Sequence, residues 1–103
     1  MVDVDDGDGD DNVEVVRDRR RDFGDEVVRI RVLRVPESEK FPEGIKYAFH
    51  YGRKDGDDPI LRYDNHHGVH ERHNNSELEE IEFPGTEALL RRFVRELPDH
   101  VSP

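Results

Sequence analysis

The 103-residue chain contains no cysteine, only three lysines and no long hydrophobic run. The absence of cysteine excludes disulfides, thiolate metal sites and cysteine nucleophiles. No apolar stretch approaches the length needed to span a membrane, and the first thirty residues lack the pattern of a signal peptide. We therefore expect a cytoplasmic protein with no membrane partner. At this length the chain forms one small domain at most.

Charge dominates the composition: 41% of residues are charged, 32% are hydrophobic, and the net charge is −10 at pH 7. Thirteen arginines accompany the three lysines. Acid-rich, lysine-poor composition is what we expect of a halophilic protein, because the Debye length falls to about 3 Å at 1 M salt. The net charge then indicates solubility and does not exclude a nucleic-acid partner.

The first twelve residues, "MVDVDDGDGDDN", hold six aspartates and no basic or aromatic side chain. Such a run predicts a disordered acidic arm over residues 1–12. The alternative is an arm that mimics nucleic acid or docks on a basic partner. Residues 13–98 are then the single folded domain, and we expect residues 99–103 to fray.

Strand patterns follow one another from Val13 onward. Two β-branched, arginine-rich runs flank "DFGD", where Gly24 can supply a tight turn; we expect the first run to be an edge strand. "IKYAFHY" carries three aromatic residues at alternate positions, and "ILRYDN" continues the same period. Gly68 allows a bend into "VHERH", and "ELEEIEF" predicts the last strand.

After Pro84 and Gly85 the apolar period changes to that of a helix. The apolar stripe consists of Leu89, Leu90, Phe93, Val94 and Leu97. Thr86 is a reasonable N-cap, and Pro98 ends the helix. The sequence thus predicts an α+β fold: an antiparallel meander of about five to six short strands, with one C-terminal amphipathic helix packed on one face.

The other face of this sheet is left open, and strand alternation says what it carries. Its predicted residues are largely cationic: Arg29, Arg31, Lys46, His50 and Arg62, with Asp64 beside them. Arginine suits planar, bidentate contact with phosphate, so this face is a candidate nucleic-acid surface. The alternative is an ordinary solvated face stabilised by cross-strand ion pairs.

Four of the six histidines lie between His66 and His73, within "LRYDNHHGVHERHNN". This cluster allows a zinc site, general acid–base chemistry or an exposed polar turn. For acid–base chemistry, Asp64 could orient a nearby imidazole, and Asn65 or Arg62 could hold an oxyanion. The residue pattern alone favours the exposed turn.

Several segments together resemble the TumE family of toxins from prokaryotic toxin–antitoxin modules. They are "RVP" at residues 34–36, "YAFHYG", "LRYDNHHGVHERH", a short acidic strand ending in "EF", and a helix with "LLRRFV". The likeness covers about residues 14–97, and its motif falls on Tyr63, Asp64, Asn65, Gly68, His70 and His73. In the family pattern one residue separates the last two histidines, whereas two do here, so a regular strand places them on opposite faces.

The resemblance implies growth inhibition through RNA cleavage or tight RNA binding, countered by a helix-turn-helix antitoxin. Our leading hypothesis is a metal-independent endoribonuclease without a cofactor. Its catalytic residues are expected to be His70, His73 and Asp64, with Asp64 setting the histidine tautomer. Its expected RNA-binding residues are Arg29, Arg31, Lys46, His50, Arg62, Tyr63 and Asn65, the last two also shaping the hairpin. The alternatives are a non-enzymatic RNA- or protein-binding module and a divalent-metal protein; a homodimer is also left open.

Overall fold

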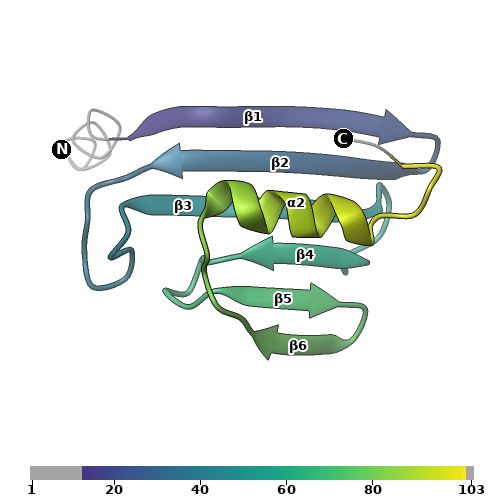
Figure 1. The fold of residues 1–103 in the computed structure, drawn as a ribbon. Coiled ribbons are helices and arrows are strands. Elements are labelled where there is room, and N and C mark those ends of the chain that lie inside the picture. Colours follow the sequence, from purple (N-terminus) through teal and green to yellow (C-terminus); the bar gives the residue numbers. More distant parts are fainter. Residues whose placement is uncertain (1–12, 102–103) are drawn as a thin grey trace, which may run out of the picture.

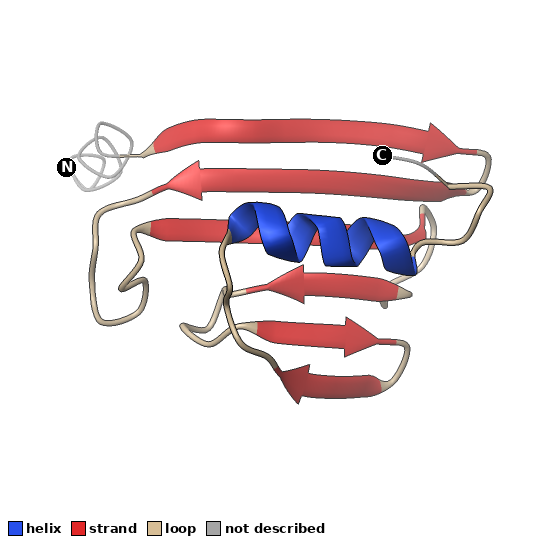
Figure 2. Cartoon of the chain, in the orientation of Figure 1, coloured by secondary structure: helices blue, strands red, loops and turns tan. Residues whose placement is uncertain are grey.

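The computed structural model describes residues 13–101 of the chain. Within this range a six-stranded antiparallel sheet in the order β1-β2-β3-β4-β5-β6 precedes the helix α2, as Figures 1 and 2 show. The elements are β1 Glu14–Phe23, β2 Glu26–Arg34, β3 Ile45–Arg53, β4 Leu61–Asp64, β5 Glu71–Asn74, β6 Glu77–Glu80 and α2 Thr86–Glu96. This arrangement confirms the predicted α+β meander. The predicted acidic arm lies outside the described residues.

Short connections make the meander regular. Gly24 has φ 63° in the turn between β1 and β2, and Gly68 has φ 87° in the bend between β4 and β5. Both conformations favour glycine, as the sequence predicted. The register between β1 and β2 shifts between Val15 and Arg17, which marks a β-bulge near the start of the edge strand.

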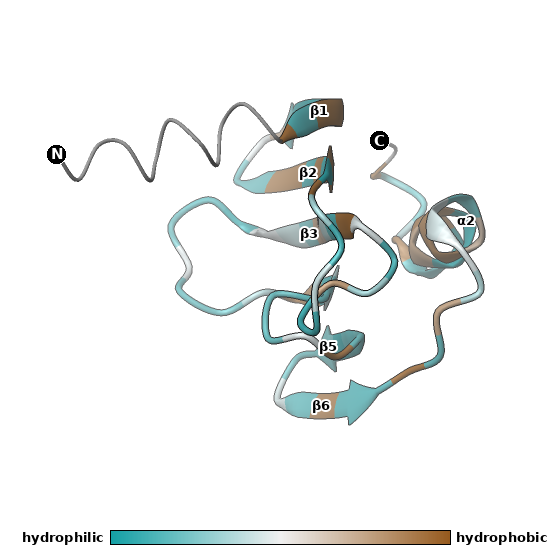
Figure 3. Cartoon of the chain, turned by 90° about the vertical axis from the view of Figure 1, so that its left-hand side faces the viewer, coloured by the Kyte–Doolittle hydropathy of each residue, from teal (hydrophilic) through white to brown (hydrophobic). Residues whose placement is uncertain are grey.

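The helix packs on one face of the sheet, and no helix among residues 13–101 covers the other face, as the side view in Figure 3 shows. The core lies between them and consists of Val28, Ile30, Val32, Tyr47, Phe49, Tyr51, Leu61, Tyr63, Leu89, Leu90, Phe93, Leu97 and Val101. Phe93 of α2 is completely buried, and the centroid of its ring lies 5.7 Å from the ring centroids of both Phe49 and Tyr63. Each large side chain buried in this way stabilises the fold by about 1.5–3 kcal/mol, so the aromatic contacts fix the helix position.

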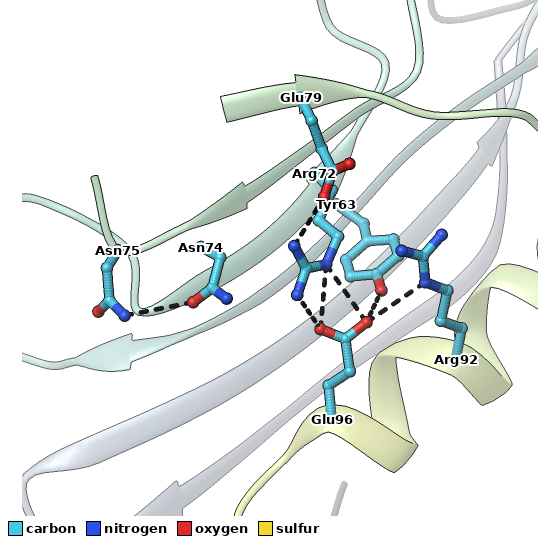
Figure 4. A network of polar contacts seen from close by, with 7 residues as sticks. All are labelled: Tyr63, Arg72, Asn74, Asn75, Glu79, Arg92 and Glu96. Atoms are coloured by element: carbon cyan, nitrogen blue, oxygen red, sulfur yellow. Dashed lines mark hydrogen bonds and ion pairs between the residues drawn. The ribbon is translucent and has the colours of Figure 1, made fainter. Parts of the chain in front are cut away.

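A polar network anchors the end of α2 to the sheet, as Figure 4 shows. The Glu96 carboxylate accepts hydrogen bonds from the Tyr63 hydroxyl and from Arg72 Nε at 3.0 Å, and Arg92 Nε lies 3.3 Å away. Arg72 also donates to Glu79 at 2.8 Å. Burial and the bond to Glu96 raise the pKa of Tyr63 to about 12, so its hydroxyl stays protonated and donates. Tyr63 therefore belongs to the helix side of the sheet.

The C-terminal part differs from prediction in two places. Gly85 is the N-cap of α2 and no side chain caps it, so Thr86 is the first helical residue and its predicted capping role is wrong. Val94 is 37% exposed, so it does not join the buried stripe. Beyond the helix, the N–H of Val101 donates to the Pro98 carbonyl, and the Val101 side chain is buried in the core.

Candidate nucleic-acid interface

The open face is built by strand register, since directly paired residues point to the same side of a sheet. One row of paired residues crosses all six strands: Arg20, Arg29, His50, Arg62, His73 and Leu78. The neighbouring row is Asp18, Arg31, Ala48, Asp64, Glu71 and Glu80. Alternation in the sequence thus correctly predicted that Arg29, Arg31, His50 and Arg62 share a face.

A groove of about 330 Å³ runs over the centre of this face. It is lined by Arg20, Val27, Arg29, Arg31, Ala48, His50, Arg62 and His66. Ala48 is the smallest side chain of its row, so it forms the bottom of a depression whose sides are the longer arginine side chains. A hollow of about 80 Å³ continues the groove past Ala48 to Lys46. The sequence therefore makes both a cationic rim and the depression that the rim encloses.

The arginines of β2 remain available to an external anion. Arg29 and Arg31 share one carboxylate, that of Asp18, at 3.4 Å and 3.8 Å, and about half of each arginine side chain is exposed. Exposed ion pairs of this kind contribute only about 0–1 kcal/mol, because solvent and salt screen them. A phosphate can therefore replace Asp18 at little expense in stability.

Arg62 is the most connected cation of the groove. Its Nε donates to Asp64 at 2.8 Å, its NH2 group lies 2.8 Å from His66 Nε2, and its NH1 group lies 3.4 Å from His50 Nδ1. Asp64 in turn accepts from the backbone N–H of His66 at 3.1 Å, a turn that aspartate often makes two residues before a donor. This turn brings His66 over the groove.

Both histidines beside Arg62 are held in the neutral state. Burial lowers the pKa of His50, and the charge of Arg62 lowers it further. Burial also lowers the pKa of His66; the Asp64 carboxylate opposes this effect, whereas Arg62, Lys46 and His67 add to it. A neutral imidazole at neutral pH is able to accept a proton.

The two histidines expected to be catalytic lie on opposite sides of the sheet. His73 pairs with Arg62 on the open face. His70 lies on the helix side, where its ring stacks on Phe83 at 4.4 Å and its Nδ1 lies 3.0 Å from the Tyr47 hydroxyl. The predicted contact of Asp64 with His70 is therefore not found, because the Asp64 carboxylate faces the open side.

Tyr63 and Asn65 also lie away from the groove. Asn65 is 2% exposed; its side chain accepts from the Tyr47 N–H at 3.0 Å and donates to the Ile45 carbonyl at 2.8 Å. It thus ties the end of β4 to β3, and Tyr63 is buried against α2. Their expected contact with substrate is not supported by these positions, whereas the expected shaping of the hairpin fits Asn65.

Arg20 and His66 line the groove but were not among the open-face residues predicted from the sequence. Alternation ends at Asp64, where β4 ends, and the backbone turn places His66 on the open face. An Asp two residues before a histidine was the available signal, since this spacing is typical of an aspartate-stabilised turn. Without the structure the turn does not say which face the ring joins.

The histidine cluster provides no metal site in the described part of the chain. Over residues 13–101, no group of three or more His, Asp or Glu side chains has a geometry that could hold a metal ion. The strand directions explain this, since His70 and His73 are separated by the thickness of the sheet. The zinc interpretation thus has no ligand set in this range.

A larger hollow, of about 780 Å³, lies on the helix side, between α2 and the segment that follows β6. Its charged lining mixes Glu79, Glu80 and Glu82 with Arg92 and Arg95. The mixture lacks the cationic surplus that a polyanion requires, so size alone does not make it the nucleic-acid surface.

Comparison with protein families decides what class of protein carries this groove. The family model described as "Toxin TumE" matches residues 4–101, nearly the whole chain. The chain belongs to the TumE toxin family. It is accordingly the toxin of a toxin–antitoxin module, with an antitoxin as its partner. A search of the curated proteins and a search of the solved structures each found no match to this toxin.

The single helix among residues 13–101 of the toxin is too short and too polar to cross a membrane.

Proposed function

We propose that this TumE toxin binds RNA in the groove of its open sheet face and cleaves it as a metal-independent endoribonuclease. The observation that carries the proposal is the groove itself. Four arginines line it, Lys46 extends it, and two imidazoles lie within it. Arginine clusters on a surface recognise phosphate by bidentate hydrogen bonds, and this preference outweighs the net negative charge of the whole chain.

RNA suits this site better than DNA for a chemical reason. The 2′-hydroxyl of RNA is an internal nucleophile, so cleavage needs proton transfer and charge neutralisation but no nucleophile from the protein. A chain without cysteine but with histidines beside arginines can supply both. In this proposal Arg29 and Arg31 hold the phosphodiester backbone, and histidines on the open face move the protons.

Of the residues expected to be catalytic, His73 and Asp64 share the open face, and His70 does not. We propose His73 as an additional contact to RNA next to Arg62. Asp64 holds Arg62 and the turn at His66. The antitoxin is proposed to be a helix-turn-helix protein, and the site of action is proposed to be the cytoplasm, where RNA is accessible.

The same groove also supports a toxin that binds RNA without cutting it. The two functions differ in one measurable respect, which is the appearance of new RNA ends. The purified toxin should therefore be incubated with total cellular RNA at high salt and, in parallel, titrated with a short single-stranded RNA. We expect discrete cleavage products together with binding that weakens as salt increases.

The test variant is Arg29→Ala with Arg31→Ala. It should weaken RNA binding and reduce the salt slope of log K by about 1.4, since each phosphate contact on single-stranded RNA contributes about 0.7. The control is Arg91→Ala with Arg95→Ala, which removes the same charge from α2, on the other side of the sheet. Equal losses in both variants would mean that the open face has no special role, and binding without cleavage by the wild type would refute the enzyme.

A further inference from the structure

We infer that His50 and His66 form the proton-transfer pair of the toxin, with Arg62 between them as the phosphate clamp that uncovers them. The inference rests on the proposed function and assigns its chemistry to two histidines outside the expected catalytic set. It starts from one geometric fact: the two terminal nitrogens of one guanidinium contact two different imidazoles in the same groove.

The contacts determine the tautomer of each ring. A guanidinium has five N–H donors and no acceptor, so any imidazole nitrogen bonded to it must accept. His66 therefore accepts at Nε2 and carries its proton on Nδ1. His50 accepts at Nδ1 and carries its proton on Nε2. Each ring is neutral and presents its lone pair toward the place where Arg62 lies.

The position of His50 is fixed from below as well. Its Nε2 lies above Gly52, where an added Cβ would come within 3.2 Å of that nitrogen. Gly52 is itself buried near the end of β3. The missing side chain thus makes room for the ring, and Arg62 orients the ring from the opposite side. Two independent contacts of this kind hold a proton-transfer group in place.

Binding of RNA changes what the rings face. A phosphodiester competes for the same guanidinium fork, since arginine pairs bidentately with phosphate. When Arg62 turns its terminal nitrogens onto the phosphate, the two lone pairs are left directed at the bound phosphodiester. The phosphate charge also offsets that of Arg62, which raises the proton affinity of both rings and lets one of them carry a second proton.

The reaction then balances without any further reactant. One neutral imidazole takes the proton of the 2′-hydroxyl, and the 2′-oxygen forms a bond to the adjacent phosphorus. The bond from phosphorus to the 5′-oxygen breaks, and the other imidazole, which carries a second proton at the start of the step, gives that proton to the 5′-oxygen. At the end the first ring is protonated and the second is neutral. The products are a 2′,3′-cyclic phosphate and a 5′-hydroxyl end, and Arg29 and Arg31 neutralise the phosphate charge during the step.

The charges around the pair predict the pH dependence of cleavage. Charged groups surround the rings. Those on the strands are Arg20, Arg29, Arg31, Lys46, Arg62 and Asp64, with Asp18 behind Arg29 and Arg31, and the exposed His67 lies outside the groove in the turn next to His66. Burial is the main cause that lowers the pKa of both rings below the ordinary value for histidine, and the charge of Arg62 lowers both further. The profile of kcat/KM should therefore be bell-shaped, with its optimum on the acid side of neutrality.

The first test uses the wild-type toxin and needs no cleavage. Long-range proton–nitrogen correlation by NMR reports which ring nitrogen carries the proton. We expect the Nδ1–H form for His66 and the Nε2–H form for His50, and inorganic phosphate should shift both rings while leaving His100 unchanged. The opposite tautomers, or rings that ignore phosphate, would overturn the inference.

The second test compares cleavage rates of variants. His50→Asn and His66→Asn should each lower the rate about 10²- to 10⁴-fold, with the dissociation constant for RNA changed by less than about threefold. The double variant should lose little more, because the two groups act as a unit. His67→Asn is the matched control, because it removes the imidazole of an exposed residue in the same turn as His66.

The outcomes separate the two proposals. If the wild type cuts RNA and either His50→Asn or His66→Asn cleaves within about tenfold of the wild-type rate, the assignment of the catalytic pair is wrong, but the proposed ribonuclease function is retained. The pair is wrong in the same way if His70→Asn or His73→Asn abolishes cleavage while His50→Asn and His66→Asn do not. If the wild type never cuts RNA, the proposed function fails and the catalytic pair fails with it.

Discussion

Replacing Asn65 with alanine is expected to destabilise the toxin strongly without touching its groove. The side-chain amide is buried, and it satisfies two backbone groups of β3, the N–H of Tyr47 and the carbonyl of Ile45. Alanine fills neither role. Both backbone groups would then be left in a site with little access to water, next to the buried ring of Tyr47.

The magnitude follows from these two contacts. A buried polar group that loses its partner costs about 1–3 kcal/mol, so the substitution should lower the free energy of unfolding by about 2–6 kcal/mol. A domain of this size has a total stability of about 5–15 kcal/mol, so the loss is a large part of it. Near the melting temperature, each kcal/mol corresponds to about 4–8 °C, which makes a fall in Tm of more than about 8 °C the minimum expectation.

Urea unfolding followed by circular dichroism measures this change, with Asn74→Ala as the control. Asn74 is only half-buried in β5, and its side chain contacts that of Asn75, so its loss should remain within about 0.5 kcal/mol. An Asn65→Ala variant within about 1 kcal/mol of the wild type would refute the structural role. RNA affinity of the folded variant should be unchanged, and a selective loss of affinity would restore the contact with substrate expected from the sequence.

Two further predictions concern the turn and the groove. Gly68→Ala and Gly24→Ala each force alanine to a positive φ, which destabilises the fold by about 1–2 kcal/mol. Gly68→Ala should be the more destabilising, because its Cβ would lie 3.2 Å from Lys40 Cγ, whereas Gly24 has open space around it. Equal melting temperatures of the two variants would contradict this. The lowered pKa values of His50 and His66 mean that the unfolded chain binds more protons, so stability should be full above pH 7 and fall as the pH drops below the ordinary value of 6.5. Urea midpoints measured between pH 8 and pH 5.5 should show this slope, the double variant His50→Asn and His66→Asn should flatten it, and a midpoint that rises on acidification would count against it.

The fold was predictable from the sequence because local signals agreed with one another. Alternation in β2 and β3 assigned Ile30 and Phe49 to the core and Arg29 and His50 to the open face, and the structure confirms each position. The change of period after Gly85 located the helix. These signals depend on neighbouring residues alone, which is why one sequence was enough.

The site was only partly predictable, because contacts at turns depend on the backbone path. The triplet Tyr63, Asp64 and Asn65 resembles one functional motif. The structure nevertheless places Tyr63 in the core, Asp64 on the open face beside Arg62, and Asn65 in a buried contact with β3. The turn after β4 places His66 in the groove, whereas the His70 ring stacks on Phe83 on the other side of the sheet. Which histidine contacts Arg62 depends on the tertiary structure, because strand alternation stops at Asp64 and does not extend to the histidines that follow.

The alternation of the central strands also allows the core and the open face to change independently by substitution. In β2 and β3 the residues that hold the core and those that line the groove take turns along the same chain. A single-residue insertion there would exchange the two sets and destroy both properties at once. A substitution at an open-face position such as Arg29 instead leaves its core neighbours Val28 and Ile30 in place. On the proposed function, such a substitution weakens RNA binding and toxicity while the toxin stays folded, so a loss of toxicity does not require a loss of the fold.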